Sequence, residues 1–349
     1  MKIASIINEH YDAFVSRYKG KVLPGHLKAL NAMRHCRTPE AGELYVRCPD
    51  CDHAKWQPLS CGHRNCPQCQ NHETSHWIDR QRNKLLPVHY FMVTFTLPRE
   101  FRSLAYRNQR IIYSLMFSCV SSTLKDFGRN PKHLGADMGM TMVLHTHSRK
   151  LDFHPHIHAV VPAGGIDKQR RQFKKKKGKY LFHQKALAKV FRARILDGLN
   201  RLGLAVPKGI RPEWIVDCAR VGTGITALTY LSRYLYRGVI TERNIVAHQN
   251  GQVTFRYTES KTGKSCLRTL KGEEFLRLIL RHVLPRGFRR IRDYGFLHSN
   301  AKKILALVQL VLHIRIHLPE LRPRPAFMCP CCKSSMLVIG FRPPGNKPG

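Results

Sequence analysis

Phe153–Val161 reads FHPHIHAVV, in which three histidines occupy every second position before an apolar run. Side chains alternate between the two faces of a β-strand, so a strand here places His154, His156 and His158 on one face. A row of neutral imidazoles suits a transition metal, or a divalent cation held over a phosphate. The pattern therefore predicts a strand that carries a metal or phosphate site. The simpler alternative is a histidine-rich polar edge of a sheet.

Two apolar segments are predicted to pair near this strand. His89–Leu97 is apolar and β-branched, as buried strands are. Met140–His147 precedes the histidine strand across a short turn at Ser148–Asp152, which predicts a hairpin. If this hairpin pairs His145 with His156, the two side chains share a face, and His145 becomes a third ligand. A slip of one residue in the register would remove it from the site.

The composition is strongly basic. The 349 residues, enough for two or three domains, include 60 Lys and Arg against 22 Asp and Glu, a formal net charge of +38. Such an excess indicates a polyanionic partner, most often nucleic acid. The sequence has no apolar run that could span a bilayer, no secretory signal pattern and no GxxxxGK[ST] phosphate loop. We therefore expect a cytoplasmic nucleic-acid-binding protein that requires neither a membrane nor ATP.

Twelve cysteines occur, and their close pairs within a histidine-rich region favour metal-bound thiolates over disulfides. Cys48-Pro-Asp-Cys51 and Cys66-Pro-Gln-Cys69 are two CxxC motifs separated by 14 residues. Two such motifs supply the four sulfurs of a tetrahedral, structural Zn²⁺ site. The late CPCC motif at 329–332 holds one CxxC, which alone is a weak signal. Three further residues near the first two motifs are possible zinc ligands, in one site or two: Cys36, Cys61 and His63.

The segment Ile225–Arg237, ITALTYLSRYLYR, has the apolar period of a helix. Tyr230 and Tyr234 are four residues apart, so on a helix they share a face beside the leucine stripe. Arg233 and Arg237 flank them. Two amphipathic tyrosines at the edge of a core are the simpler interpretation. Apolar spacing predicts further helices over residues 1–30, 101–127, 184–202, 272–284 and 301–318. Asn250-Gly251, between β-prone residues, predicts a hairpin turn.

Residues 168–179, KQRRQFKKKKGK, hold eight Lys and Arg and no acid. A charge run of this kind is typical of a solvated, flexible loop. Because the run follows the histidine strand in a basic chain, we expect the loop to bind the phosphates of the polyanionic partner. The predicted contacts are Lys174, Lys175, Lys176 and Lys177.

Taken in order, these segments resemble the two-tyrosine rolling-circle transposases of bacterial insertion sequences. The set is HRNCPQCQ (63–70), YFMVTFTLP (90–98), LHTHSRKLDFHPHIHAVVPAGG (144–165), YLSRYLYR (230–237) and HVLPRGFRRIRDYGFL (282–297). Within that family the chain is similar to the insertion-sequence ninety-one group, which carries an N-terminal zinc-binding domain. The family belongs to the HUH endonucleases, named for a histidine-hydrophobe-histidine motif that His156-Ile157-His158 matches.

The resemblance implies an α+β fold, in which an HUH endonuclease core, an antiparallel sheet flanked by helices, follows a small zinc-binding domain. We expect an N-terminal helix and zinc-binding domain at 1–85 and a nuclease or transposase core at 86–260. A C-terminal helical region at 261–318 and a Pro/Arg/Cys-rich tail at 319–349 follow.

The resemblance also implies a chemistry. His156 and His158 would hold Mg²⁺ or Mn²⁺, and Tyr230 or Tyr234 would attack single-stranded DNA to form a 5′-phosphotyrosine. Arg233 and Arg237 would contact the DNA. The protein would act at melted transposon ends in the bacterial nucleoid.

Four other functions fit parts of the sequence. A plasmid replication initiator or a relaxase shares the core chemistry, and the zinc domain with its flanking motifs favours transposition over both. A histidine-triad nucleotide hydrolase also has alternating histidines, but this function explains neither the cysteine block nor the charge of +38. A DNA-binding protein without catalysis is disfavoured because both histidines of the HUH motif are present.

Overall fold

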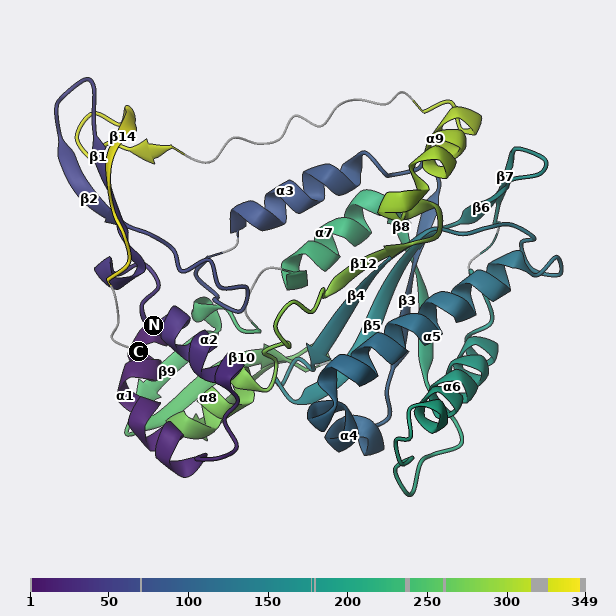
Figure 1. Cartoon of the computed structure of the whole chain (residues 1–349), viewed down its shortest axis with the longest axis horizontal. Helices are drawn as coiled ribbons and strands as arrows, with labels where there is room; N and C mark the ends of the chain where they lie inside the picture. The colour runs from purple at the N-terminus through teal and green to yellow at the C-terminus, as the bar shows by residue number, and fades with distance from the viewer. Residues whose placement is uncertain are drawn as a thin grey trace.

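A five-stranded antiparallel sheet forms the centre of the computed structural model (Figure 1). The structure describes residues 2–69, 71–176, 178, 180–235, 239–259, 262–314 and 326–345, without the side chains of 71–74, 227, 230, 231 and 233–235. Neighbouring strands of the sheet follow the order β12-β4-β5-β3-β8, and every pair is antiparallel. The strands are β3 (His89–Thr96), β4 (Met140–His147), β5 (Phe153–Pro162), β8 (Val216–Thr223) and β12 (Ile291–Tyr294). The predicted α+β fold with an antiparallel core sheet is thus confirmed.

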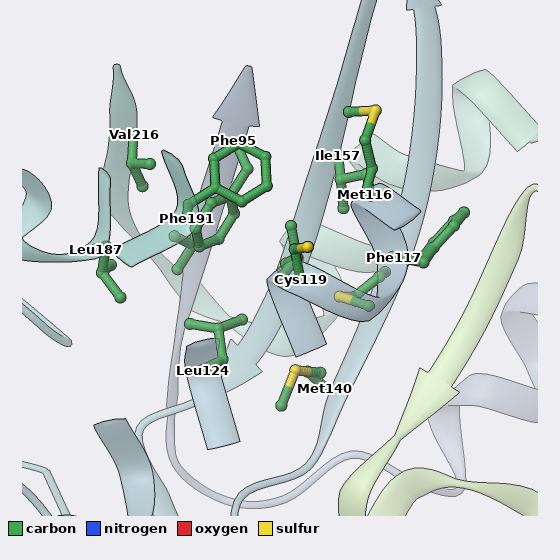
Figure 2. Close-up of a cluster of buried hydrophobic side chains, with 14 of the residues drawn as sticks. Phe95, Met116, Phe117, Cys119, Leu124, Met140, Ile157, Leu187, Phe191 and Val216 are labelled. Atoms are coloured by element: carbon green, nitrogen blue, oxygen red, sulfur yellow. The ribbon is translucent and has the colours of Figure 1, made fainter. Parts of the chain in front are cut away.

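One face of this sheet is covered by helices and carries the main hydrophobic core. The helices are α4 (Arg102–Arg107), α5 (Gln109–Arg129) and α6 (Gln184–Arg201). Alternate strand residues such as Phe95 and Ile157 point toward them and are fully buried against Phe117 and Phe191 (Figure 2). Burying this apolar face forces the intervening histidines of β5 to the opposite face.

The opposite face is covered by α3 (Asn71–Arg82) and α7 (Gly224–Leu235), which lie side by side (Figure 1). Leu228 of α7 is buried with Tyr90, Val143 and Val160 of the sheet. The start of α7 lies very close to β3, because a Cβ at Gly224 would be 2.8 Å from Tyr90 Cε2. The histidine face of the sheet therefore lies beneath α7.

A second lobe joins the two N-terminal helices to a three-stranded sheet with the order β11-β10-β9. Asn250 and Gly251 form the tight turn between β9 and β10 with φ of 50° and 69°, which confirms the predicted hairpin. The elements are α1 (Ile3–Arg17), α2 (Pro24–Arg34), β9 (Ile245–Gln249), β10 (Gln252–Thr258), β11 (Ser265–Lys271) and α8 (Gly272–Leu280).

This lobe corrects one predicted domain boundary. The boundary between residues 260 and 261 falls inside the β10–β11 hairpin, whose strands pair over their whole length. The region 261–318, predicted to be helical, also contributes β12 to the central sheet. Strand pairing joins the predicted C-terminal region to the core, through β10 with β11 and through β4 with β12. Helical periodicity in the sequence gives no information about such pairing.

The third lobe is a small sheet built from both ends of the chain, with the order β13-β14-β1-β2. Its strands are β1 (Glu43–Arg47), β2 (Ala54–Pro58), β13 (Phe327–Met328) and β14 (Ser335–Arg342). The remaining elements are the hairpin β6 (Gly164–Asp167) and β7 (Gln172–Lys175), helix α9 (Lys302–Val311), and 3₁₀ turns at Pro39–Ala41, Arg99–Phe101, Glu242–Asn244, Gly295–Leu297 and Ser299–Ala301. Within the described residues, every helix is too short or too polar to cross a bilayer.

Candidate metal centre and active-site cleft

Three histidines meet on the face of the sheet beneath α7. His145 of β4 lies directly opposite His156 of β5, which is the register that brings it into the site. One ring nitrogen from each of His145, His156 and His158 lies within 4.8 Å of the others. We call these residues the histidine trio. The structure thus brings the predicted third residue beside the HUH pair.

Hydrogen bonds fix the orientation of two rings in the trio. His156 Nδ1 lies 2.7 Å from the carbonyl oxygen of His154 and must donate its proton, since a carbonyl only accepts. This tautomer leaves the His156 Nε2 lone pair for a metal. His158 Nδ1 lies 2.9 Å from the hydroxyl oxygen of Thr94, the residue that faces it across the β3–β5 pair.

Burial keeps the trio neutral. It lowers the pKa of His156 to about 3 and that of His158 to about 4, and it holds the pKa of His145 well below its ordinary value. Neutral imidazole is the form that binds metals. Three imidazole nitrogens with their outer partners therefore fit a divalent metal, and the all-nitrogen set favours Mn²⁺ or another transition ion over Mg²⁺, which prefers oxygen ligands.

His154 lies on the same face of β5 but outside the trio. Its Nδ1 instead accepts a hydrogen bond from Arg102 Nη2 at 3.1 Å. The prediction that all three alternating histidines share a face holds, but only two of them join His145. His154 contributes its backbone carbonyl to the site rather than its ring.

The trio opens into a cleft of about 680 Å³ between the central sheet and the three-stranded sheet. Arg149, from the β4–β5 turn, and Arg256 of β10 are exposed at its wall, and Asn244 and Tyr257 also line it. Cationic side chains beside a metal site suit a phosphodiester. These wall residues and Thr94 were absent from the sequence prediction, because pairing register and lobe packing, rather than a local motif, bring them to the trio.

Helix α7 brings the predicted tyrosines toward this cleft. It begins against Tyr90, continues past Leu228 above Val160, and so runs along β5 toward the end that bears His156. Tyr230 and Tyr234 lie in its second half. Their side chains and that of Arg233 lie outside the described residues, as do Arg237 and Lys177 altogether.

The predicted set of zinc ligands is divided between two places. Cys66 and Cys69 lie with Cys36 and Cys61, all four sulfurs within 4.8 Å of one another, whereas Cys48 and Cys51 lie with Cys329 and Cys332. A single site built from both N-terminal CxxC motifs is therefore wrong. The β1–β2 hairpin carries the first motif away from the second, which sequence spacing does not reveal.

The group Cys36, Cys61, Cys66 and Cys69 has the donor chemistry of a structural zinc site. Three of its members are buried in the core beneath α1 and α2. Hydrogen bonding with Cys61, Cys66 and Cys69 lowers the pKa of Cys36, while hydrogen bonding with Cys36 raises the pKa of Cys61 and of Cys66, so the protonation of each thiol depends on the others. His63 is not a member, and its Nδ1 accepts instead from the Asn65 backbone N–H at 3.3 Å.

The basic segment forms more structure than expected. Residues predicted as a flexible loop form the β6–β7 hairpin, because Gly164–Asp167 pairs with Gln172–Lys175. Lys174 Nζ bonds to Asp167 Oδ2 at 2.9 Å and donates to the Gly135 carbonyl at 2.9 Å. Lys174 therefore stabilises the hairpin rather than extending into solvent, while Lys175 is exposed and Lys176 half-buried.

Two family models match the chain. Residues 6–97 match a family described as a transposase zinc-binding domain, and residues 139–304 match a family described as a putative transposase. The first range contains the six N-terminal cysteines, and the second contains the histidine trio and the whole of α7. Neither range reaches Cys329 or Cys332.

Among solved structures, matches of low similarity include two structures of the conjugative relaxase TrwC. The metal-free structure of TrwC in complex with OriT DNA is 14% identical, covers 65% of this chain and 73% of that chain, and has a TM-score of 0.29. The complex with a mutant OriT DNA is 15% identical, covers 64% of this chain and 74% of that chain, and has the same TM-score of 0.29.

Two curated relatives match along nearly the whole chain. The putative transposase y4qJ of Sinorhizobium fredii is 29% identical, covering 97% of this chain and 94% of that protein. The transposase for insertion sequence element IS801 of Pseudomonas savastanoi pv. phaseolicola is 25% identical, covering 90% of this chain and 80% of that protein. With both domains matched in order, this chain belongs to the transposases of the insertion-sequence ninety-one group, with an N-terminal zinc-binding domain.

Proposed function

We propose that this transposase nicks and rejoins single-stranded DNA in the cleft beneath α7, through a covalent 5′-phosphotyrosine, and so drives rolling-circle transposition. The observation that carries the proposal is the histidine trio, buried on the sheet face along which α7 runs. In this proposal, the histidine trio that lines the cleft and the two tyrosines of α7 act on the same phosphodiester.

The trio is the proposed holder of a divalent cation. That cation, Mn²⁺ or Mg²⁺, would supply Lewis acidity to a phosphodiester oxygen. The protein's own part is to hold three neutral imidazoles together and to orient two of them, His156 through the His154 carbonyl and His158 through the Thr94 hydroxyl. Because these imidazole rings are already oriented, they need little reorganisation during the chemical step.

The tyrosines are the proposed nucleophiles. The phenol oxygen of Tyr230 or Tyr234 attacks phosphorus, a P–O bond to tyrosine forms, and the P–O bond to the 3′ oxygen breaks. The phenol loses its proton, and the departing 3′ oxygen gains one. Because the phosphodiester energy is kept in the tyrosine ester, attack by a 3′-hydroxyl rejoins DNA without ATP.

Two tyrosines at helical spacing allow a second cleavage while the first strand end remains attached. Positions 230 and 234 lie one turn apart on α7, a spacing that puts two positions on one face of a helix. Arg149 and Arg256 at the cleft wall would hold the entering phosphates. A lone tyrosine would support nicking but not this exchange.

A replication initiator or relaxase would share this nicking step. The match to two transposases over 97% and 90% of the chain favours transposition. A histidine-triad nucleotide hydrolase fits less well, because the family matches include the zinc-binding region as well as the histidines.

The decisive experiment incubates the full-length protein with single-stranded transposon-end DNA and Mn²⁺ or Mg²⁺. We expect a covalent protein–DNA adduct and a free 3′-hydroxyl, with the adduct mapped to Tyr230 or Tyr234 by peptide mass spectrometry. Nucleotide hydrolysis without an adduct, or binding without cleavage, would reject the proposal.

A further inference from the structure

The second cysteine group joins the two ends of the chain. Cys48 Sγ lies 3.4 Å from Cys332 Sγ, and Cys51 Sγ lies 3.5 Å from Cys329 Sγ. All four sulfurs lie within 4.8 Å of one another, and all four thiols are free. Four thiols converging on one point form the donor set of a closed tetrahedral zinc site.

The two halves of this group repeat one local structure. Each is a Cys-Pro-X-Cys turn between two strands, and in each the next residue adopts a left-handed backbone: φ is 57° at Asp52 and 65° at Lys333. The first cysteine of each turn donates its N–H to the carbonyl five residues on, at 2.8 Å in both. Two turns of the same construction, 281 positions apart in sequence, therefore face each other across one point.

Apolar packing contributes little to this third lobe. Its core contains four buried residues, two of them cysteines of the group, beside half-buried Leu44 and Phe327. Along β14, Leu337, Val338, Ile339 and Phe341 are each more than half exposed. A sheet with so small a core needs another source of stability, and a structural metal is a usual one.

We infer that Cys48, Cys51, Cys329 and Cys332 bind a second structural zinc ion, which fastens the C-terminal hairpin β13–β14 to the N-terminal domain. Each turn supplies two thiolates, so neither end of the chain completes the site alone. This ion is distinct from the one proposed for Cys36, Cys61, Cys66 and Cys69. It is also independent of the nicking chemistry, and either proposal can fail without the other.

The test counts zinc in the purified full-length protein by inductively coupled plasma mass spectrometry. Cys329→Ser/Cys332→Ser should contain about one zinc ion fewer per chain than the Cys331→Ser control. Cys331 is the right control because it is exposed in the same turn but outside the group. Equal zinc content in the two variants would overturn the inference. So would disulfides among these four residues in the native protein, found by alkylation and mass spectrometry without reductant.

A second measurement avoids substituting the ligands. A specific protease site is placed within residues 315–325, and the cleaved protein is passed through a gel-filtration column. The fragment containing β13 and β14 should co-elute with the rest of the chain, and should separate from it after a zinc chelator is added. Separation before chelation, or retention after complete removal of zinc, would contradict the inference.

Discussion

At the scale of single residues, the site depends on side chains that orient other side chains. His145 was predictable, because β4 and β5 are joined by a short turn and a hairpin register follows from the pattern of the two strands. Thr94 was not predictable, since it reaches His158 across β3 and β5, which are far apart in sequence. Periodicity assigns a residue to a face, but long-range register decides its neighbour.

The first prediction concerns the trio itself. His156→Ala and His158→Ala should each lower adduct formation on single-stranded DNA by roughly 10³-fold or more, because the lost Lewis acid supplies several kcal/mol. Affinity for DNA, measured by fluorescence anisotropy, should change little. The control is His154→Ala, whose ring lies on the same face outside the trio. Undiminished cleavage in EDTA would show that no metal takes part.

The second prediction concerns the hydroxyl that orients His158. Thr94→Val keeps the side-chain shape but removes the 2.9 Å hydrogen bond to His158 Nδ1. Loss of such an outer partner should weaken Mn²⁺ binding about 10- to 100-fold. Titration calorimetry without DNA measures this, and Thr94→Ser, which keeps the hydroxyl, should bind as the wild type does. Equal affinity in the valine variant would mean that Thr94 has no positioning role.

At the scale of elements, individual helices and hairpins were predictable from the sequence, but the grouping of the cysteines into metal sites was not. The strand Met140–His147 and the turn at Asn250 and Gly251 are local patterns, and both occur as predicted. Sequence spacing places Cys66 and Cys48 in one zinc site, but the β1–β2 hairpin separates them. Cys329 and Cys332, from the C-terminal part of the chain, lie beside Cys48 instead. Ligand grouping depends on how hairpins are placed in space.

The third prediction counts zinc in pairs of variants, to distinguish the cysteine groups seen in the structure from the single group predicted by sequence spacing. Cys36→Ser and Cys66→Ser should each lose the same zinc ion, so the double variant should lose about one ion. Cys66→Ser combined with Cys48→Ser should lose about two, since these residues belong to different groups. Cys266→Ser, outside both groups, is the control. Loss of a single ion in the second pair would restore the grouping suggested by sequence spacing.

The fourth prediction concerns α7. Tyr230→Phe/Tyr234→Phe removes two hydroxyls and should abolish the adduct, because both positions share one face of a helix that runs toward His156. Each single variant should retain one nick but fail in complete transposition. Tyr236→Phe, the control, should form adducts normally, because a spacing of two residues from Tyr234 is not a helical repeat. DNA attached to Tyr236 would contradict the assignment of Tyr230 and Tyr234 as the nucleophiles.

At the scale of the whole molecule, charge and topology act together. The central sheet holds the trio, the second lobe closes the cleft with β10, and the β1–β2 hairpin pairs with the C-terminal β14 in the third lobe. The charge of +38 was plain from composition and indicated the polyanionic partner. Composition did not show which cations line the cleft, because some, like Lys174, are paired with acids inside the fold.

The fifth prediction follows from the distinction between cations that line the cleft and cations that are paired with acids. A protein that neutralises about 6–10 phosphates should lose about 10³- to 10⁵-fold in DNA affinity between about 50 and 200 mM salt, because bound counterions are released. Arg149→Ala and Arg256→Ala, at the cleft wall, should each reduce the slope of log affinity against log salt by about 0.7 for single-stranded DNA.

The control for this slope is Arg201→Ala. Arg201 is paired with Asp197 at 2.7 Å on α6, which covers the face of the sheet opposite the trio. Its replacement removes the same charge as the two cleft variants but from a place that DNA in the cleft does not reach, so the slope should stay unchanged. An equal reduction in all three variants would mean that net charge, rather than the path through the cleft, governs binding. No reduction at Arg149 or Arg256 would place the DNA elsewhere on the molecule.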